Sequence, residues 1–307
     1  MQQMNKMTNI KLGINLNCLT NRYPEPEEWT KIVQELGIKF VQFNADILDP
    51  SLPWEIQERV ITKTLELCKQ RGITICSSFG GHNHHQNYLG HPDEEIAKYY
   101  KNFYKNLIKQ TSLLGGDGVG TCFAIMSVSD FSDPEKKKQI LNRAAQDYIE
   151  LSKYAKEQGL KYLLFETTSV PRETCATFEE TDYVLKLLEN MEIPMRLCLD
   201  VGHINMEDPN AKEANPYEWI RKYGKISPVI HIQQTNNKSS CHWPFTPEFN
   251  EKGNIHPEKV IAAIEESGAE DCLLAFEMKE KAFYPSEQKV INNLRDSINY
   301  WREYVKK

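Results

Sequence analysis

Short apolar runs of β type alternate with longer amphipathic segments along the whole chain, and this alternation limits the possible folds more than any other feature. Each apolar run precedes a segment with helical spacing, and two of these segments stop at a glycine, Gly72 and Gly159. The expected strands are 10–17, 39–46, 73–79, 117–124, 161–166, 195–200, 228–234 and 272–277. The expected helices lie near 26–36, 54–71, 93–114, 134–158, 178–190, 216–223, 257–267 and 286–304.

Eight successive strand–helix units predict a closed barrel. Strands that alternate with helices are parallel and are joined by right-handed crossovers. Eight such units in 307 residues match a (β/α)8 TIM barrel. A doubly wound open sheet is the structural alternative, and it is weakened because no G-x-G-x-x-G motif follows the first strand. Because no low-complexity segment or shift in composition marks a second domain, we expect one TIM-barrel domain over residues 1–307.

The overall composition narrows the functional classes. A hydrophobic content of 40% is enough for a large core, and a net charge of −6 is a poor match to a nucleic-acid backbone. The N-terminus lacks an apolar signal region and no run of 18 apolar residues occurs, so we expect neither secretion nor a membrane span. The eight cysteines form no C-x-x-C pair, which favours a reduced, cytoplasmic protein. Four of them lie in strand-like apolar runs and are interpreted as core residues: Cys76, Cys122, Cys198 and Cys272.

Each of the last four expected strands ends in, or carries near its end, a potential metal ligand. These residues are Glu166, Asp200, His231 and Glu277. Barrel enzymes build their sites at the C-terminal ends of their strands, so the four side chains could converge. A lone carboxylate there is often a helix cap, and a lone histidine is often a core residue. Four in succession favour a cation site instead, because carboxylates near a barrel axis repel one another unless a cation neutralises them or their pKa values rise. Three carboxylates and one imidazole suit Mn²⁺, Mg²⁺ or Co²⁺ better than a structural thiolate zinc site.

The motifs LLFE, LCLDVGH, HIQQ and LLAFE, which carry these four residues, resemble those of a known family. They are similar to the xylose isomerase-like superfamily of sugar (phosphate) isomerases and epimerases, and especially to its ketose 3-epimerase branch. The similarity in layout covers nearly the whole chain and is most specific over residues 161–277. The resemblance implies that Glu166, Asp200, His231 and Glu277 bind one divalent ion, usually manganese, with Mg²⁺, Co²⁺ or Zn²⁺ as alternatives. It also implies that Glu166 and Glu277 exchange protons with the substrate and that His203 contacts a substrate oxygen.

The chemistry of C3 inversion is consistent with that ligand set. A proton α to a ketone is weakly acidic, so its removal needs a base and stabilisation of the resulting enediolate. A divalent cation supplies this stabilisation as a Lewis acid. Inversion then needs one carboxylate on each face of the planar intermediate, one to remove the proton and one to return it.

Two departures from the free-sugar epimerases point to an anionic substrate. Six residues beyond Glu166, where those enzymes typically have a second glutamate, this chain has Arg172, whose guanidinium suits a phosphate or carboxylate. A long insert, residues 233–250, follows His231 and includes Lys238, His242 and Trp243. This loop could close over a short polar substrate, or it could be an oligomer contact.

A third candidate contact comes from the glycine-rich turn after the third expected strand. There His82 follows Gly80 and Gly81 and could hold a substrate oxygen, although histidines on such loops are often only solvated. The partners we expect are a small sugar or sugar phosphate, with no nucleic acid and no membrane. Relatives commonly assemble as a homodimer or homotetramer. Within the superfamily, the sequence looks most similar to enzymes that invert C3 of tetrulose phosphates, such as erythrulose 1-phosphate.

Four other functions remain open at this point. An aldose–ketose isomerase would use the same cation and carboxylates, and a metal-dependent decarboxylase of a 3-oxo sugar acid could use Arg172 to hold a carboxylate. An apurinic endonuclease-like phosphodiesterase would need further histidines on early strands and an Asp-x-His motif. The segment SSCHW offers His242 but not the aspartate. A non-catalytic binding module is disfavoured because all four expected ligands are present.

Overall fold

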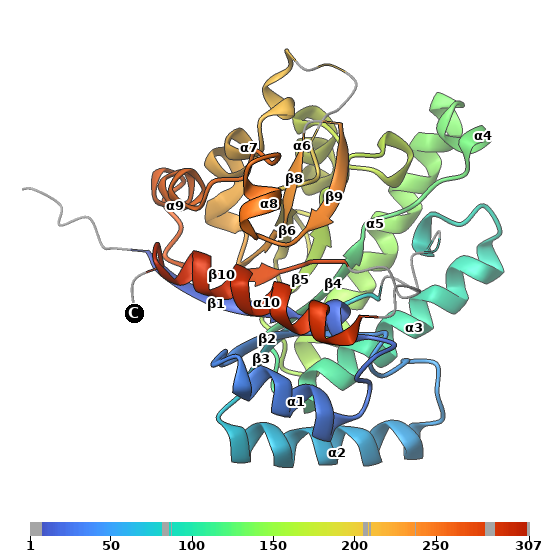
Figure 1. The fold of residues 1–307 in the computed structure, drawn as a ribbon. Helices are drawn as coiled ribbons and strands as arrows, with labels where there is room; N and C mark the ends of the chain where they lie inside the picture. The colour runs from blue at the N-terminus through green and yellow to red at the C-terminus, as the bar shows by residue number, and fades with distance from the viewer. Residues whose placement is uncertain are drawn as a thin grey trace, which may run out of the picture.

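Eight parallel strands close into a barrel in the computed structural model, which describes residues 8–81, 86, 88–204, 208, 210–236, 238–279 and 286–305. Around the barrel the strands follow the order β1-β10-β7-β6-β5-β4-β3-β2, and every neighbouring pair is parallel. Their bounds are β1 Asn9–Asn15, β2 Phe40–Asn44, β3 Thr74–Phe79, β4 Gly118–Cys122, β5 Tyr162–Glu166, β6 Met195–Asp200, β7 Val229–Ile232 and β10 Asp271–Phe276. The predicted (β/α)8 TIM barrel is therefore confirmed (Figure 1).

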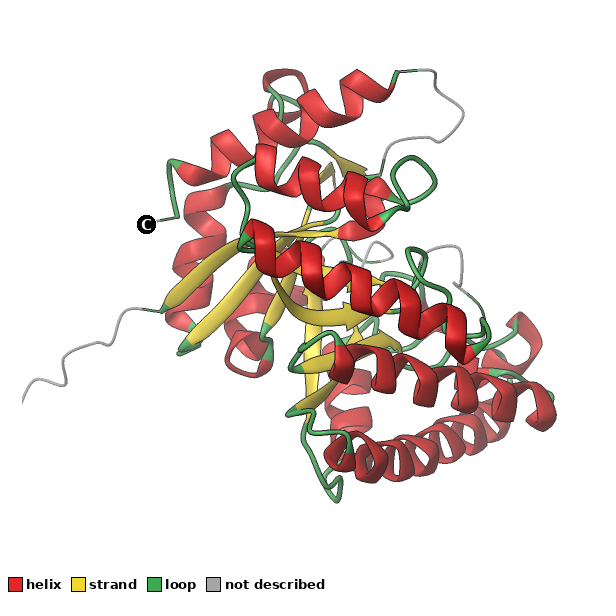
Figure 2. Ribbon diagram, turned by 90° about the horizontal axis from the view of Figure 1, so that it is seen from below, coloured by secondary structure: helices red, strands yellow, loops and turns green. Residues whose placement is uncertain are grey.

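Helices surround the strands, as Figure 2 shows, and each barrel strand is followed by one of them. These helices are α1 Pro26–Glu35, α2 Trp54–Arg71, α3 Glu94–Leu113, α5 Pro134–Glu157, α6 Phe178–Leu187, α7 Pro216–Tyr223, α9 Pro257–Glu266 and α10 Glu287–Arg302. Side-chain caps fix several of their starts. Asp93 accepts hydrogen bonds from the first-turn amides of α3, and Asp133 does the same for α5, where Pro134 takes the first helical position.

The segments that the sequence did not predict lie in the connections. The expected strand 228–234 ends at Ile232, and the chain then forms an antiparallel hairpin of β8 (Gln234–Asn236) and β9 (Ser239–Trp243). Short helices α4 (Val128–Phe131) and α8 (Pro247–Asn250) are also new. Single 3-10 turns complete the connections: η1 Leu16–Leu19, η2 Tyr88–Gly90, η3 Pro171–Glu173, η4 Lys212–Ala214 and η5 Gly224–Ile226. These segments escape prediction because they are too short to show a hydrophobic period.

Two apolar layers hold the barrel together. The larger one lies between strands and helices and includes the fully buried Trp29 and Trp301. The smaller one fills the barrel interior with one or two side chains from most strands: Phe79, Leu164, Cys198, Val229, Leu273 and Ala275. Because the interior is packed, polar side chains that point inward beyond this layer gather at the carboxyl end of the strands.

Three of the four cysteines that the sequence placed in the core, Cys122, Cys198 and Cys272, are buried thiols. Cys76 is only partly buried. It lies at the start of β3, where a pocket at the amino end of the barrel, lined also by Lys11 and Asp117, admits solvent.

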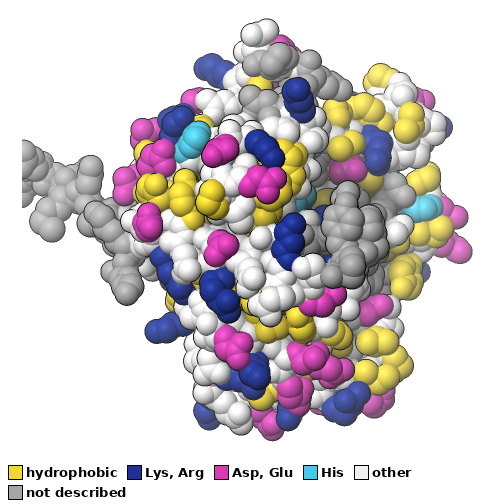
Figure 3. All heavy atoms as spheres, viewed as in Figure 1, with side chains coloured by type: hydrophobic (Ala, Val, Ile, Leu, Met, Phe, Trp, Pro, Cys, Tyr) yellow, Lys and Arg dark blue, Asp and Glu magenta, His cyan; other side chains and the backbone are white. Residues whose placement is uncertain are grey.

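The surface carries both signs of charge. On the face shown in Figure 3, Lys and Arg side chains are interspersed with Asp and Glu side chains. None of the helices in the described part of the chain is both long and apolar enough to span a membrane.

We predict that Gly120→Ala lowers the free energy of unfolding by about 1–3 kcal/mol, the usual cost of overpacking a core. A Cβ at Gly120 would collide with Leu164 of the neighbouring strand inside the barrel. Chemical denaturation followed by circular dichroism measures this free energy. The nearest atom is the Cβ of Leu164, so in the double variant with Leu164→Gly, which removes that Cβ, the loss should be smaller than the sum of the two single losses. Strictly additive losses would contradict the interior collision.

Candidate metal centre and active site

Four side chains from four adjacent strands meet just above the interior layer. Successive residues in a strand point to opposite faces, so each of these residues lies on the same face as the interior residue two positions before it. Glu166 thus follows Leu164, and His231 follows Val229. In the same way Asp200 follows Cys198, and Glu277, directly after β10, follows Ala275. Within the described residues, ligand atoms of the four all lie within 4.8 Å of one another, and all four residues are buried.

His231 lies between the two glutamates. Its Nδ1 is 2.9 Å from Glu166 Oε1 and 3.0 Å from Glu277 Oε2, and the residue has no exposed surface. Ligands at right angles around a cation, with bonds of about 2.1 Å, are themselves about 3.0 Å apart. These separations therefore fit neighbouring ligands of one cation. The donor set fits as well, because three buried carboxylates face a single imidazole and leave an excess of negative charge.

Asp200 is held in place by neutral donors. The backbone N–H of Gly202 donates to its Oδ1 at 2.6 Å, and Gln233 Nε2 lies 2.9 and 3.0 Å from its two oxygens. Glycine at position 202 leaves room for the Gln233 amide, because a Cβ there would collide with that amide unless the side chain moved away from Asp200. Burial raises the pKa of Asp200, and the charge of His203 opposes that shift.

Glu277 is stabilised as an anion. Burial is the largest single influence and would raise its pKa, but the charge of His231, the hydrogen bond to His231 and the charge of His242 together bring the pKa to about 2. Asn17 Nδ2 also donates to Glu277 Oε1 at 3.0 Å. Burial likewise acts to lower the pKa of His231, and the neighbouring Cys198 and Glu277 raise it well above its ordinary value.

Two further histidines border the cluster. Side-chain atoms of Asp200, His203 and His242 form a second group within 4.8 Å, and the two imidazole rings are 6.0 Å apart. His203 Nδ1 lies 2.9 Å from the carbonyl of Thr167 and 3.8 Å from Glu166 Oε1. Burial would lower the pKa of His203, but the charges of Asp200, Glu166 and Glu277 raise it to about 9. His203 and His242, expected from the sequence as substrate contacts, thus both lie at the site.

The hairpin β8–β9 is attached to the cluster through Gln233. While the amide nitrogen of this side chain faces Asp200, its Oε1 accepts a hydrogen bond from the backbone N–H of His242 at 2.5 Å. Gln233 Nε2 also lies 3.0 Å from Ser240 Oγ. On the other side, His242 Nδ1 lies 2.9 Å from the carbonyl oxygen of Glu277.

Of the remaining expected substrate contacts, three have neighbours outside the four-residue cluster and one cannot be placed. Arg172, in η3, forms an ion pair with Glu173 at 3.3 Å. Lys238 is exposed at the hairpin turn, and the ring of Trp243 packs against Phe249 at a centroid distance of 5.2 Å. His82 lies outside the described residues.

A cavity of about 30 Å³ opens beside Glu166 and Glu277. Its other walls come mainly from the first strands: Asn17, Asn44, Phe79, Gly80, Gly81, Tyr88 and Cys122. The sequence analysis did not identify the polar members Asn17, Asn44 and Tyr88. For the first two a signal existed, since Asn17 ends the first expected strand and Asn44 lies near the end of the second. Tyr88 gave none, because it lies in a connection.

Lys279 is another residue that sequence reasoning missed. It stands two positions beyond Glu277, and its backbone N–H donates to the carbonyl of His242 at 3.0 Å. Burial lowers the pKa of Lys279 and the charge of Glu277 opposes that shift, so the ammonium lies within electrostatic range of the cluster.

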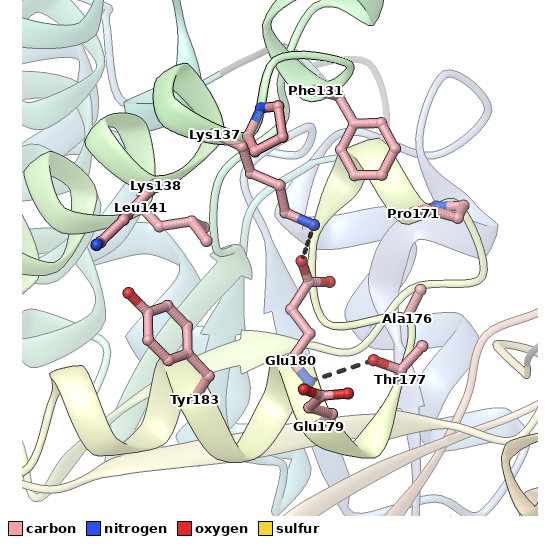
Figure 4. Close-up of a pocket in the computed structure, with 11 residues that line it drawn as sticks. Phe131, Lys137, Lys138, Leu141, Pro171, Ala176, Thr177, Glu179, Glu180 and Tyr183 are labelled. Carbon is pink, nitrogen blue, oxygen red and sulfur yellow. Dashed lines mark hydrogen bonds and ion pairs between the residues drawn. The ribbon is translucent and has the colours of Figure 1, made fainter.

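A second pocket, of about 590 Å³, lies outside the barrel between α5 and α6 (Figure 4). Its described lining includes none of the four clustered residues. Lys137 there is paired with Glu180 at 2.7 Å and lies 4.5 Å from the ring centre of Phe131. Because the Lys137 ammonium is already paired with Glu180, the barrel mouth is the better candidate for an active site.

Comparison with known proteins agrees with this geometry. Residues 30–304 match the family described as xylose isomerase-like TIM barrel. The chain belongs to this family. It is 32% identical to the D-erythrulose 1-phosphate 3-epimerase of Brucella abortus (strain 2308), over 301 residues that make up 96% of each protein. It is therefore an enzyme of an isomerase and epimerase family, as the sequence predicted.

Solved structures give the same fold. A crystal structure named "Putative Xylose isomerase", from Rhodospirillum rubrum, superposes with a TM-score of 0.88 at 26% identity and covers 96% of this chain and 99% of that one. The D-psicose 3-epimerase of Clostridium cellulolyticum, solved with D-tagatose, has a TM-score of 0.72 at 17% identity over 97% of this chain and 100% of that one. At 17% identity, the comparison with the D-psicose 3-epimerase shows only that the two proteins share a fold.

We predict that a chelator such as EDTA lowers the melting temperature of the purified protein and that added Mn²⁺ restores it. A cation that binds only the folded state stabilises it by mass action, and here it would also relieve repulsion among the buried carboxylates. In the variant Asp200→Asn, the Mn²⁺ concentration that gives half of the rise in melting temperature should increase at least tenfold, as measured by differential scanning fluorimetry. The exposed-site variant Glu258→Gln is the matched control. Equal responses in both variants would contradict a cation at the cluster.

Proposed function

We propose that this enzyme inverts C3 of a short ketose phosphate and that erythrulose 1-phosphate, in its D and L forms, is its substrate pair. One observation carries the proposal: Glu166 and Glu277 line the same small cavity and both contact Nδ1 of His231. Two carboxylates that flank one reacting carbon are what removal and return of a proton on opposite faces require. The 32% identity to the D-erythrulose 1-phosphate 3-epimerase of Brucella abortus supports the choice of sugar.

Each site residue has a distinct part in the proposed reaction. Glu166, Asp200, His231 and Glu277 would hold a divalent cation, Mn²⁺ being the first choice, which as a Lewis acid stabilises negative charge on the oxygens of the enediolate. One glutamate removes the C3 proton and the other returns a proton to the opposite face. With a pKa of about 2, Glu277 is ionised at neutral pH, so it presents a carboxylate and not a carboxylic acid to the substrate.

His203 is proposed to bind a substrate oxygen. With a pKa of about 9 it is protonated at neutral pH, and a charged donor binds a developing oxyanion more strongly than a neutral one. His242, on the opposite side of Asp200 in the second group, is suited to the same task.

The size of the cavity favours a short sugar. A volume of about 30 Å³ is on the scale of one or two water molecules. It suits the single hydroxymethyl carbon that follows C3 in a tetrulose, whereas a pentulose or hexulose would need room for a longer tail.

The reaction in D₂O tests this function against its alternatives. Purified enzyme with Mn²⁺ and D-erythrulose 1-phosphate should give the L enantiomer with deuterium at C3. Loss of the C3 proton signal in ¹H NMR measures the exchange, and polarimetry measures the inversion. With erythrulose 4-phosphate, whose C1 hydroxyl is free, an aldose product with label at C2 would identify an aldose–ketose isomerase instead. Loss of carbon dioxide from a 3-oxo sugar acid would identify a decarboxylase, and nicking of abasic DNA would identify an endonuclease.

We predict that Glu277→Gln and Glu166→Gln each lower the rate of epimerisation by about 10²–10⁴-fold, the usual contribution of a general acid or base. The two variants should differ in which epimer still exchanges its C3 proton, because each retains the base on one face only. Exchange of the C3 proton from the separate D and L epimers, measured by NMR, makes the distinction. Full epimerase activity in either variant would disprove the two-carboxylate mechanism.

The phosphate group needs a cation at the mouth, and we propose Lys279 for this role ahead of Arg172 and Lys238. Lys279 adjoins both Glu277 and His242, whereas Arg172 is paired with Glu173 and Lys238 lies at the hairpin turn. A charge-assisted hydrogen bond to phosphate contributes about 1.5–3 kcal/mol.

We predict that Lys279→Met raises KM for erythrulose 1-phosphate by about 10–100-fold. A factor of this size corresponds to the free energy of one such hydrogen bond. The loss should be smaller for unphosphorylated erythrulose. Steady-state kinetics of Lys279→Met, Lys238→Met and Arg172→Met, side by side, rank the three cations. A larger effect in one of the other two variants would reassign the phosphate contact to that residue.

A further inference from the structure

One bulky side chain in the wall of the small cavity stands on a backbone conformation that such residues rarely adopt. Tyr88, the first residue of the turn η2, has a φ of 51°. Left-handed backbone is unfavourable for an aromatic residue and persists only where the surroundings fix it. Tyr88 lines the same cavity as Glu166 and Glu277. An outlier that the fold maintains beside a candidate active site indicates that its side chain has a task there.

Three contacts hold the turn η2 in place. Arg143, from α5, donates through Nη2 to the carbonyl oxygen of His91 at 2.5 Å. The backbone N–H of His91 donates in turn to the carbonyl oxygen of Tyr88 at 3.2 Å. Gly90 lies so close to the backbone of Ile125 that an added Cβ would be 2.6 Å from its nitrogen. The phenol ring therefore approaches the barrel mouth from a fixed base.

The side chain of Tyr88 is buried, and its hydroxyl end reaches the cavity. The residue is 2% exposed, and its ring meets that of Tyr100 edge-on at a centroid distance of 5.3 Å. A Cβ added to Gly80, another cavity residue, would lie 3.3 Å from Tyr88 Oη. Burial raises the pKa of Tyr88 well above its ordinary value, so the phenol keeps its proton. One wall of the cavity is thus a fixed ring with a hydroxyl that can donate a hydrogen bond.

The two amide side chains in the lining already have protein partners. Asn17 Nδ2 donates to Glu277 Oε1 at 3.0 Å. Asn44 Nδ2 donates to Asn15 Oδ1 at 3.2 Å, and Asn15 Nδ2 in turn donates to Gln42 Oε1 at 2.9 Å. A phenol hydroxyl, by contrast, can rotate its proton to suit a ligand. Tyr88 is therefore the better suited of these side chains to donate to a sugar hydroxyl.

The volume of the cavity decides which end of the substrate faces Tyr88. A space of about 30 Å³ is on the scale of one or two water molecules, and a phosphate group is larger than that. The proposed phosphate contact, Lys279, adjoins the hairpin at His242 and is not part of the described lining. The end of the sugar without phosphate, C4 and its hydroxyl, is therefore the part that fits beside Tyr88.

We propose that Tyr88 sets the length of the substrate: its hydroxyl donates to the C4 hydroxyl of the sugar, and its ring fills the place that a fifth carbon would need. This inference rests on the proposed function, because it takes C3 to lie between Glu166 and Glu277. A longer ketose phosphate would have to displace a ring that close packing holds in place.

Removal of the ring tests the limit on length. In Tyr88→Ala, the ratio of kcat/KM for ribulose 1-phosphate to kcat/KM for erythrulose 1-phosphate should rise about tenfold or more over that of the wild type. The matched control is Tyr223→Ala, which removes a tyrosine of 4% exposure from the same core, outside the described lining of the cavity. This control should leave the ratio unchanged. No rise in Tyr88→Ala, or an equal rise in both variants, overturns the proposal.

The hydroxyl is tested separately in Tyr88→Phe, which keeps the ring. Loss of one neutral hydrogen bond should lower kcat/KM for erythrulose 1-phosphate by about 2–10-fold. With 4-deoxyerythrulose 1-phosphate, which has no hydroxyl at C4, variant and wild type should be alike. Equal losses on both substrates overturn the proposed contact. If circular dichroism shows that Tyr88→Ala does not fold, this comparison decides the proposal.

Binding without turnover separates this inference from the proposed function. The reduced sugars erythritol 1-phosphate and ribitol 1-phosphate cannot react, and isothermal titration measures their affinities. The wild-type protein should bind the four-carbon compound about tenfold more tightly or better, and Tyr88→Ala should lose this preference. If the wild-type protein does not epimerise erythrulose 1-phosphate, the proposed function fails, whereas the titrations still decide whether Tyr88 limits the length of the ligand.

Discussion

The contact of one buried imidazole nitrogen with two carboxylates is the constraint on which the rest of the site depends. His231 Nδ1 meets Glu166 and Glu277 at 2.9 and 3.0 Å in a position with no exposed surface. Charges so close, away from water, are tolerated only when other groups compensate them. The surroundings supply this compensation: Asn17 donates to Glu277, and Gln233 and the Gly202 amide donate to Asp200. Each donor comes from a different connection at the carboxyl end of the barrel, so the site draws on most of the fold.

The inward-facing polar residues differ in charge between the two sides of the barrel. Strands β5, β6 and β7 and the end of β10 contribute the charged cluster, whereas β1 and β2 contribute neutral amides at the same level. The two-residue period of strands brings both sets to the same mouth, because the residue two positions beyond each interior apolar side chain points to the same face. Amides satisfy buried hydrogen bonds without adding charge. The charged residues of the barrel mouth can therefore all be grouped in the one cluster around His231.

Much of this arrangement could be read from the sequence, and its limits have physical causes. Glu166, Asp200, His231 and Glu277 were identifiable because strand ends in a barrel converge irrespective of loop structure. Asn15 and Gln42 were overlooked because a single amide in an apolar strand carries no spacing signal. The hairpin β8–β9 and the location of Lys279 depend on contacts between connections that are distant in sequence, such as the Lys279 amide and the His242 carbonyl. The prediction that Arg172 contacts the substrate remains a prediction, and the structure adds that Arg172 pairs with its neighbour in the chain, Glu173.

The side chain of Gln233 joins two parts of the molecule through a single planar group. Its amide nitrogen binds Asp200 while its oxygen holds the backbone N–H of His242 in the hairpin. Because the amide is rigid, a rotation that reorients one end displaces the other. If the cluster holds the proposed cation, binding of that cation and the position of the hairpin are linked equilibria, and linkage is reciprocal. A ligand that orders the hairpin would then strengthen cation binding by the same factor by which the cation strengthens binding of that ligand.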